Sequence, residues 1–225
     1  MKTLNYFHTH VHENMKNHGI LVTLQLVRVH NTLRKPGPVF LEMGKAAYAA
    51  GADYFYRVND DTEFISPFAK AYTEALGKLS KPYGVVGPYS VHSSKTTAKS
   101  QNRILTHDFV HRLHMEIFGM NYYPPELTDW WMDDWISHVY GKERTFISHD
   151  IAVMHHTTTH GKRYMVDYDN EKFLNPLIKS GRVRILEWMN QNKDDLPSNA
   201  IKDYTRNYKD FSPYFFDDIN DLKQK

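Results

Sequence analysis

The stretch from Gly51 to Phe64, GADYFYRVNDDTEF, decides the fold. Residues 54–58 (YFYRV) are mostly β-formers in a run too short for a helix, which predicts a strand. The run ends in Asn59, Asp60 and Asp61, where open α/β sheets place their ligand sites. Adjacent carboxylates repel each other unless a cation neutralises them, and hard oxygen ligands favour Mg²⁺ or Mn²⁺. The alternative is an acidic turn that caps the next helix.

The segments around this stretch alternate between strand-like and helix-like sequence. A strand is predicted at Ile20–Val29, a helix at Phe40–Ala50 with Gly51 as its terminator, a helix from Pro67 to about Leu79, and a short strand at Val85–Val86. This alternation predicts an α/β fold with a mainly parallel sheet and helices on its faces.

The second half of the chain is less regular. Residues 91–103 are polar and lack periodicity, which predicts a surface loop. The patterns that follow predict strands at 104–110 and 145–156 and helices at 111–118, 130–140, 171–180 and 183–191. We expect one domain over 1–191, with 1–19 as a poorly defined lead-in, and an aromatic-rich tail over 192–225 packed against it.

Composition narrows the class of protein. The chain has 225 residues, 41% of them hydrophobic, which is typical of a globular protein with one substantial core. A net charge of +2 is too balanced for a protein whose main task is to grip nucleic acid. We expect no transmembrane segment and no secretory signal. The expectation is therefore a soluble protein. Because the chain has no cysteine, redox chemistry does not identify its compartment, which could be the cytoplasm or, if the chain is part of a longer one, the lumen of the secretory pathway.

A second acidic pair, Asp133 and Asp134, lies in the aromatic segment WWMDDWI. Indole rings stack on sugar rings, so Trp130, Trp131 and Trp135 suggest a ligand surface. A partly desolvated carboxylate has a raised pKa, which suits a general base. The alternative is a helix N-terminus whose aspartates complement the dipole, with the tryptophans in the core.

A third cluster contains His155, His156 and His160, followed by Lys162 and Arg163. A histidine at a strand end can complete a metal site begun by a carboxylate elsewhere, and the two basic residues could neutralise phosphate oxygens. A solvated polar loop is the alternative. The chain has no HEXXH motif, P-loop, GxSxG motif, or GxGxxG motif in strand context, which argues against metalloprotease, kinase, serine hydrolase and Rossmann oxidoreductase functions.

In this order, the segments NTLRKPGPVF, KAAYAAGADYFYRVNDDTEF, VVGP, THDFVHRLHMEIFG, WWMDDWIS and VMHHTTTHGKRY resemble a metal-dependent, nucleotide-sugar-using glycosyltransferase of the GT-A fold, over roughly His30 to Tyr164. The resemblance implies a Rossmann-related central sheet. It also implies a DxD-type motif that holds Mn²⁺ or Mg²⁺ against the donor diphosphate. Such folds usually begin with a nucleoside-binding strand, and only the polar segment Met1–Gly19 precedes Ile20. The resemblance therefore predicts either a fragment of a longer protein, with that first strand missing, or an incomplete base pocket.

Carried over position by position, the resemblance implies a role for each candidate. Asn59, Asp60 and Asp61 match the DxD element. Asp61 is then the direct metal ligand with Asp60, while Asn59, where aspartate is commoner, contacts the ribose or a metal-bound water. His155 best fits the metal-binding histidine, with His156 and His160 as alternates, and Arg163, with Lys162, meets the diphosphate. Asp134 is favoured as catalytic base, with Asp133 in reserve, and the three tryptophans shape the acceptor side.

The expected function is transfer of a sugar from a nucleotide-diphosphate donor, a UDP-sugar by preference, to a hydroxyl of a glycan, protein or lipid. Two alternatives stay open. One is an inactive nucleotide- or carbohydrate-binding module, and the other is a metal-dependent phosphohydrolase that uses the same aspartates and histidines.

Overall fold

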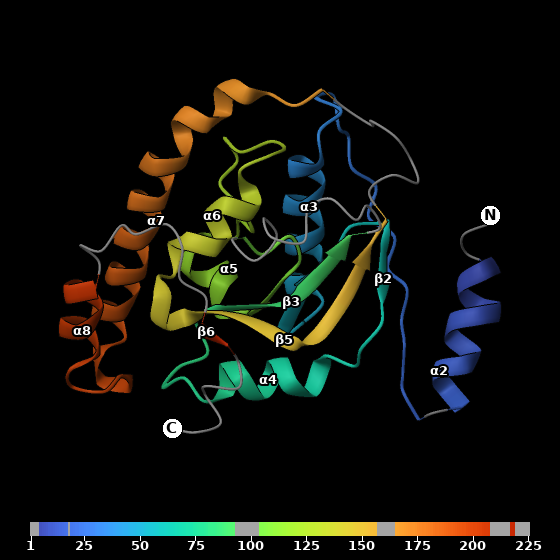
Figure 1. Cartoon of the computed structure of the whole chain (residues 1–225), viewed down its shortest axis with the longest axis horizontal. Coiled ribbons are helices and arrows are strands. Elements are labelled where there is room, and N and C mark those ends of the chain that lie inside the picture. Colours follow the sequence, from blue (N-terminus) through green and yellow to red (C-terminus); the bar gives the residue numbers. More distant parts are fainter. Residues whose placement is uncertain (1–4, 18, 93–103, 157–164, 208–216, 219–225) are drawn as a thin grey trace. The chain divides into compact units, whose positions relative to one another are not determined.

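The computed structural model describes residues 5–17, 19–92, 104–156, 165–207 and 217–218 (Figure 1). The chain divides into two units, residues 1–30 and residues 31–225. Each unit is described by itself.

The first unit contains a π-helical turn, η1 (Phe7–His12), and one short helix, α2 (Glu13–Asn17). The strand predicted at Ile20–Val29 is wrong, because this segment forms no regular structure and Leu21 is 90% exposed. A strand is stable only with a partner that accepts and donates its backbone hydrogen bonds, and the described residues pair no strand with this segment. A β-branched composition favours a strand but does not show whether a partner strand is available.

The second unit holds the sheet and most of the helices. Its strands are β1 (Tyr54–Arg57), β2 (Thr62–Phe64), β3 (Val85–His92), β4 (Asp108–His111), β5 (Thr145–His155) and β6 (Asp217–Asp218). Its α-helices are α3 (Pro36–Ala49), α4 (Ala69–Gly77), α5 (Leu113–Ile117), α6 (Met132–Val139), α7 (Glu171–Gln191) and α8 (Ala200–Asn207). Short 3₁₀ turns occur at η3 (Lys142–Arg144), η4 (Tyr168–Asn170) and η5 (Lys193–Asp195).

The fold is mixed α/β, but the sheet is not mainly parallel, so that part of the prediction is wrong. The strand order is β1-β4-β3-β5-β2, with β6 also paired to β5. Only the β3/β5 and β5/β6 pairs are parallel, whereas β1/β4, β3/β4 and β2/β5 are antiparallel. A parallel crossover usually needs a helix, and the polar sequence after β3 offers no amphipathic pattern for one. Strand β4 accordingly runs back along β3.

Helices cover both faces of the sheet, as predicted. Successive strand residues point to opposite faces. On β3, Val85 belongs to the core cluster under α5, α6 and α7, while Val86 belongs to the cluster under α4. Figure 1 shows α4 on one side of β3 and β5, and α3, α5 and α6 on the other.

Local sequence signals locate most helices. α3 ends at Ala49, and Gly51 follows with a φ of +86°, which favours glycine. The two helices expected at 171–180 and 183–191 form one continuous helix, α7. Gly181 does not interrupt it. A Cβ there would lie 2.6 Å from a Val139 methyl carbon, so glycine permits close packing of α7 on α6.

Strand register brings distant segments to one place. Arg57, the last residue of β1, is paired with Asp108 on β4. Thr62, the first residue of β2, is paired with His155, the last residue of β5. The turn that contains Asn59, Asp60 and Asp61 therefore lies between the ends of β4 and β5.

Candidate functional site

Asp61 and His155 lie side by side although 94 positions separate them in the chain. Nε2 of His155 is 3.0 Å from Oδ1 of Asp61, and both side chains are largely buried. The backbone supports this contact, because the His156 N–H donates to the Asp61 carbonyl at 2.9 Å. The structure thus brings together the first and third of the three sequence clusters.

Asn59 lies against the same imidazole. Its amide Nδ2 is 3.2 Å from Nε2 of His155, the atom that also faces Asp61. A neutral imidazole nitrogen either carries a proton and donates or exposes a lone pair and accepts. Nε2 therefore cannot donate to the Asp61 carboxylate and accept from Asn59 in one state, since these contacts require opposite proton positions.

These residues fit a divalent cation by chemistry and by spacing. Carboxylate oxygen and imidazole nitrogen suit Mn²⁺, and carboxylate suits Mg²⁺. Two neighbouring ligands of an octahedral ion at about 2.1 Å stand about 3.0 Å apart, and the Asp61–His155 atoms are separated by 3.0 Å. A cation between the two atoms would use the Nε2 lone pair and replace the direct Asp61–His155 contact, and the Asn59 amide would then need another acceptor.

The other metal-ligand candidates differ in placement. Asp60 is exposed at the turn. His156 points to a different partner, because its Nε2 lies 2.9 Å from Oε2 of Glu63. His160, Lys162 and Arg163 lie outside the described residues, so their roles stay predictions. Within the described ranges, no group of three or more His, Cys, Asp or Glu side chains is placed to hold a metal.

Arg57, which sequence reasoning missed, joins the metal-side residues to the acidic pair. Its Nη1 donates to Oδ1 of Asn59 at 3.3 Å, and its Nη2 donates to Oδ1 of Asp133 at 2.5 Å. Its Nη2 also lies 2.9 Å from Asp108, and only 7% of the Arg57 side chain is exposed. Contacts therefore run continuously from Asp61 through His155, Asn59 and Arg57 to Asp133; we name these five residues the site network.

Asp108 pairs with Arg57 on the buried side of the guanidinium. Its carboxylate is fully buried and accepts hydrogen bonds from the hydroxyls of Tyr122 at 2.7 Å and Tyr123 at 2.5 Å. Burial raises the pKa values of both phenols, so they remain protonated donors at neutral pH. A buried arginine between a buried and a partly open carboxylate leaves the group with one excess negative charge.

The two aspartates of WWMDDWI have different surroundings. Asp133 touches Arg57, and 32% of its side chain remains exposed. Burial raises the pKa of Asp133 to about 6; Arg57 opposes this, and the carboxylates of Asp108 and Asp134 add to it. Burial also raises the pKa of Asp134, and the nearby His138 lowers it in part. In the described part of the chain, no hydrogen bond or ion pair joins the Asp134 side chain to the site network, whereas Asp133 is paired with Arg57, so the geometry favours Asp133 over Asp134.

The three tryptophans separate into surface and core. Trp130 is 47% exposed and packs edge-on against Tyr168, with ring centroids 5.5 Å apart. Trp131 is half-buried and adopts a left-handed backbone, φ +74°, at the start of α6. Trp135 is 1% exposed and packs in the core against Phe118. A contact between Trp135 and an acceptor is inconsistent with this burial, so we remove it from the acceptor side.

A buried aspartate fixes the exposed tryptophan in place. Asp129 accepts from the Trp130 N–H at 2.8 Å and from the Asp167 N–H at 3.0 Å. Lys35, just before α3, forms an ion pair with Asp129 at 2.5 Å and also donates to the Met165 carbonyl. These bonds tie the turn before α6 to α3 and to the start of α7.

Sequence reasoning also gave little weight to His107. This fully buried residue packs edge-on against His155, with ring centroids 5.1 Å apart, and its Nε2 is 2.6 Å from the Thr62 hydroxyl. A signal for Arg57 was available: it shares the inward face of β1 with buried Phe55, and a buried arginine needs partners. No comparable local signal marks His107.

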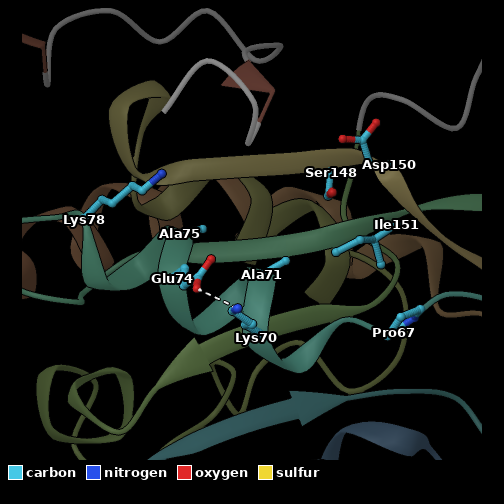
Figure 2. A pocket seen from close by; sticks show the side chains of 9 residues that line it. All are labelled: Pro67, Lys70, Ala71, Glu74, Ala75, Lys78, Ser148, Asp150 and Ile151. Atoms are coloured by element: carbon cyan, nitrogen blue, oxygen red, sulfur yellow. Dashed lines mark ion pairs between the residues drawn. The ribbon is translucent and has the colours of Figure 1, made fainter. Parts of the chain in front are cut away.

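A separate cavity of about 350 Å³ lies between α4 and β5 (Figure 2). Its floor is formed by Ala71, Ala75 and Ile151, and Lys70 and Glu74 on its rim are 3.9 Å apart. No member of the site network lines it. Charged side chains of both signs and the buried Ser148 hydroxyl also line it.

Comparison of the chain with family models, with curated proteins and with solved structures found no match in any of the three. In the described part of the chain, no helix has the length and apolar character needed to span a membrane. The site geometry therefore provides the functional argument.

Proposed function

We propose that this chain is a metal-dependent glycosyltransferase of GT-A type that transfers a sugar from a nucleotide-diphosphate donor, preferably a UDP-sugar, to an acceptor hydroxyl. The observation that carries the proposal is the site network itself. Three segments far apart in sequence meet there, one with a carboxylate and amide, one with an imidazole and one with a carboxylate open to solvent.

Each residue of the network has a chemical task in this proposal. Asp61 and His155 would hold the divalent ion, which when bound would supply positive charge against the negative charge of the departing diphosphate. Asn59 contacts His155 and, in this proposal, would meet the donor ribose or a metal-bound water. Asp133 takes the proton from the acceptor hydroxyl, since it is open to solvent and its raised pKa suits a general base near neutral pH. Asp134, the base favoured on sequence, is the competing assignment.

The acceptor side is the exposed surface beside Asp133. Trp130 and Tyr168 present aromatic rings to solvent, and such rings stack on the apolar faces of sugars. Because Asp129 fixes the turn that carries Trp130, this surface is preformed. A glycan acceptor fits it better than a lipid chain would.

The test is release of UDP from a panel of UDP-sugars with and without Mn²⁺. Asp61→Ala should reduce metal-dependent release by about 10²-fold or more, since it removes the charged ligand. Asp53→Ala is the matched control, because Asp53 lies at the opposite end of β1 and is 72% exposed. Full release by Asp61→Ala contradicts the assignment. Binding of UDP with Mn²⁺ but no release by the unchanged chain indicates the inactive binding module, and phosphate release from simple esters indicates a phosphohydrolase.

A further inference from the structure

Arg57 stands between the two halves of the site. Its guanidinium contacts both the Asn-Asp-Asp turn, through Asn59, and the acidic pair, through Asp133. It is not placed to touch a reacting sugar, because 7% of its side chain is exposed and its donors already contact protein. The proposed function assigns it no task.

The surroundings of Arg57 fix its position from several directions. Its Nε donates to Asp108 at 3.0 Å and to the Tyr123 hydroxyl at 2.7 Å, and its Nη1 donates to the Thr106 carbonyl at 2.7 Å. The guanidinium carbon lies 5.3 Å from the centroid of the Phe40 ring. Arg57 thus joins α3, β1, β4 and α6 at one point, and a planar fork of donors in fixed directions is what such a junction needs.

We propose that Arg57 is a positioning residue that sets the distance between the metal-binding side of the site, through Asn59 and His155, and the acceptor side, through Asp133. This inference rests on the proposed function, because it assigns a task within the same reaction. Arg57 acts through the side chains it holds. In transfer, donor and acceptor must be held in line, and a displacement of about 1 Å costs about 10²-fold in rate.

Arg57→Lys tests this geometry. Lysine keeps the positive charge beside Asp108 but presents one compact ammonium, so it cannot contact Asp108, Asn59 and Asp133 together. The matched control is Arg112→Lys, which makes the same exchange on an arginine paired at the surface with Glu116. We expect Arg57→Lys to lower kcat by about 10-fold or more and to weaken Mn²⁺ binding several-fold, as loss of a residue that orients a ligand does. Arg112→Lys should change both by less than about 2-fold.

Two readouts separate positioning from a merely structural role. Mn²⁺ affinity, measured by titration calorimetry on folded protein, moves only if Asn59 and His155 are displaced. The second readout is a double-mutant cycle: Asp133→Asn should cost much less kcat in the Arg57→Lys background than in the unchanged chain, because the two residues act as a unit. Additive effects with unchanged Mn²⁺ affinity overturn the inference.

Failure of this inference and failure of the proposed function are distinguishable. If the unchanged chain transfers sugar and Arg57→Lys transfers at the same rate, only the role of Arg57 is refuted. If the unchanged chain binds Mn²⁺ but transfers no sugar, the proposed function is refuted, and the effect of Arg57→Lys on Mn²⁺ affinity alone decides whether Arg57 positions the metal side. A chain that neither binds Mn²⁺ nor transfers overturns both. Should Arg57→Lys fail to fold, the double variant Arg57→Gln/Asp108→Asn takes its place in the same measurements. This double variant removes both charges of the buried pair, so it leaves no unpaired buried charge.

Discussion

Asp133 combines contact with Arg57 and partial exposure to solvent, a combination that Asp108 and Asp61 do not have. It contacts Arg57, and 32% of its side chain is exposed, whereas the side chains of Asp108 and Asp61 are 0% and 5% exposed. Burial that leaves one side open raises its pKa while keeping it accessible to an acceptor. The sequence resemblance favoured Asp134 as the base and kept Asp133 in reserve.

The raised pKa of Asp133 predicts the pH dependence of transfer. A carboxylate accepts a proton only when ionised, so kcat/KM should rise with pH through about 6 and level off above it. Arg57, Asp108 and Asp134 are the charged groups that set this value. A pH profile between about 4.5 and 8 measures it.

Two amide variants identify the base in the same assay. Asp133→Asn should lower kcat by about 10²-fold or more and remove the rise near pH 6. Asp134→Asn should keep kcat and only shift the rise to lower pH, because the Asp134 charge helps to raise the pKa of Asp133. A normal profile for Asp133→Asn with a lost profile for Asp134→Asn would show that Asp134 is the base, as the sequence first indicated.

At the scale of elements, local patterns predicted what depends on neighbouring residues and failed where distant partners decide. β1, α3, α6 and β5 follow from short-range periodicity and glycine signals, and each lies within a few residues of its predicted bounds. The failed strand at Ile20–Val29 and the antiparallel β4 both depend on which partner a strand meets. For the same reason, clusters could be named as site candidates from sequence, but the partners of Arg57 and the position of His107 became visible only with the strand register.

Gly181 lies where the sequence predicted a break between two helices, and its role in the single helix α7 can be tested. It lies inside α7, and an added Cβ would be 2.6 Å from Val139 and 3.4 Å from Trp135. Gly181→Ala should therefore destabilise the protein by about 1–3 kcal/mol through overpacking, despite the better helix propensity of alanine. Urea unfolding measures the change.

Gly77, the last residue of α4, is the matched control. No atom lies within 4 Å of its added Cβ, so Gly77→Ala should be neutral or stabilising by up to about 1 kcal/mol. Equal effects of the two substitutions would contradict close α6–α7 packing as the reason for Gly181.

At the scale of the whole molecule, one sheet carries two cores. Leu76 of α4 is fully buried in one cluster, and Ile136 of α6 is fully buried in the other. All four tryptophans of the chain lie on the α6 and α7 side, three within or against that cluster and Trp130 exposed beside it. The sheet residues between the clusters alternate in direction, so loss of either core removes support from the other.

Leu76→Ala should accordingly shift the unfolding transition seen by tryptophan fluorescence, although no tryptophan contacts its cluster. A buried leucine cut to alanine costs about 2–4 kcal/mol, and Ile136→Ala should cost a similar amount. Leu21→Ala, at a side chain 90% exposed, should stay within about 0.5 kcal/mol. A fluorescence transition unmoved by Leu76→Ala would show that the two cores unfold independently.

The opposing demands on Nε2 of His155 have a practical consequence for experiment. Nitrogen-15 chemical shifts distinguish a protonated ring nitrogen from a bare one, so the tautomer of this ring can be observed directly in solution. Paramagnetic Mn²⁺ broadens resonances more strongly the closer they lie to it, so broadening that is strongest around the His155 ring and the Asn59 amide would locate the ion. The site can thus be followed by spectroscopy before any sugar donor has been identified.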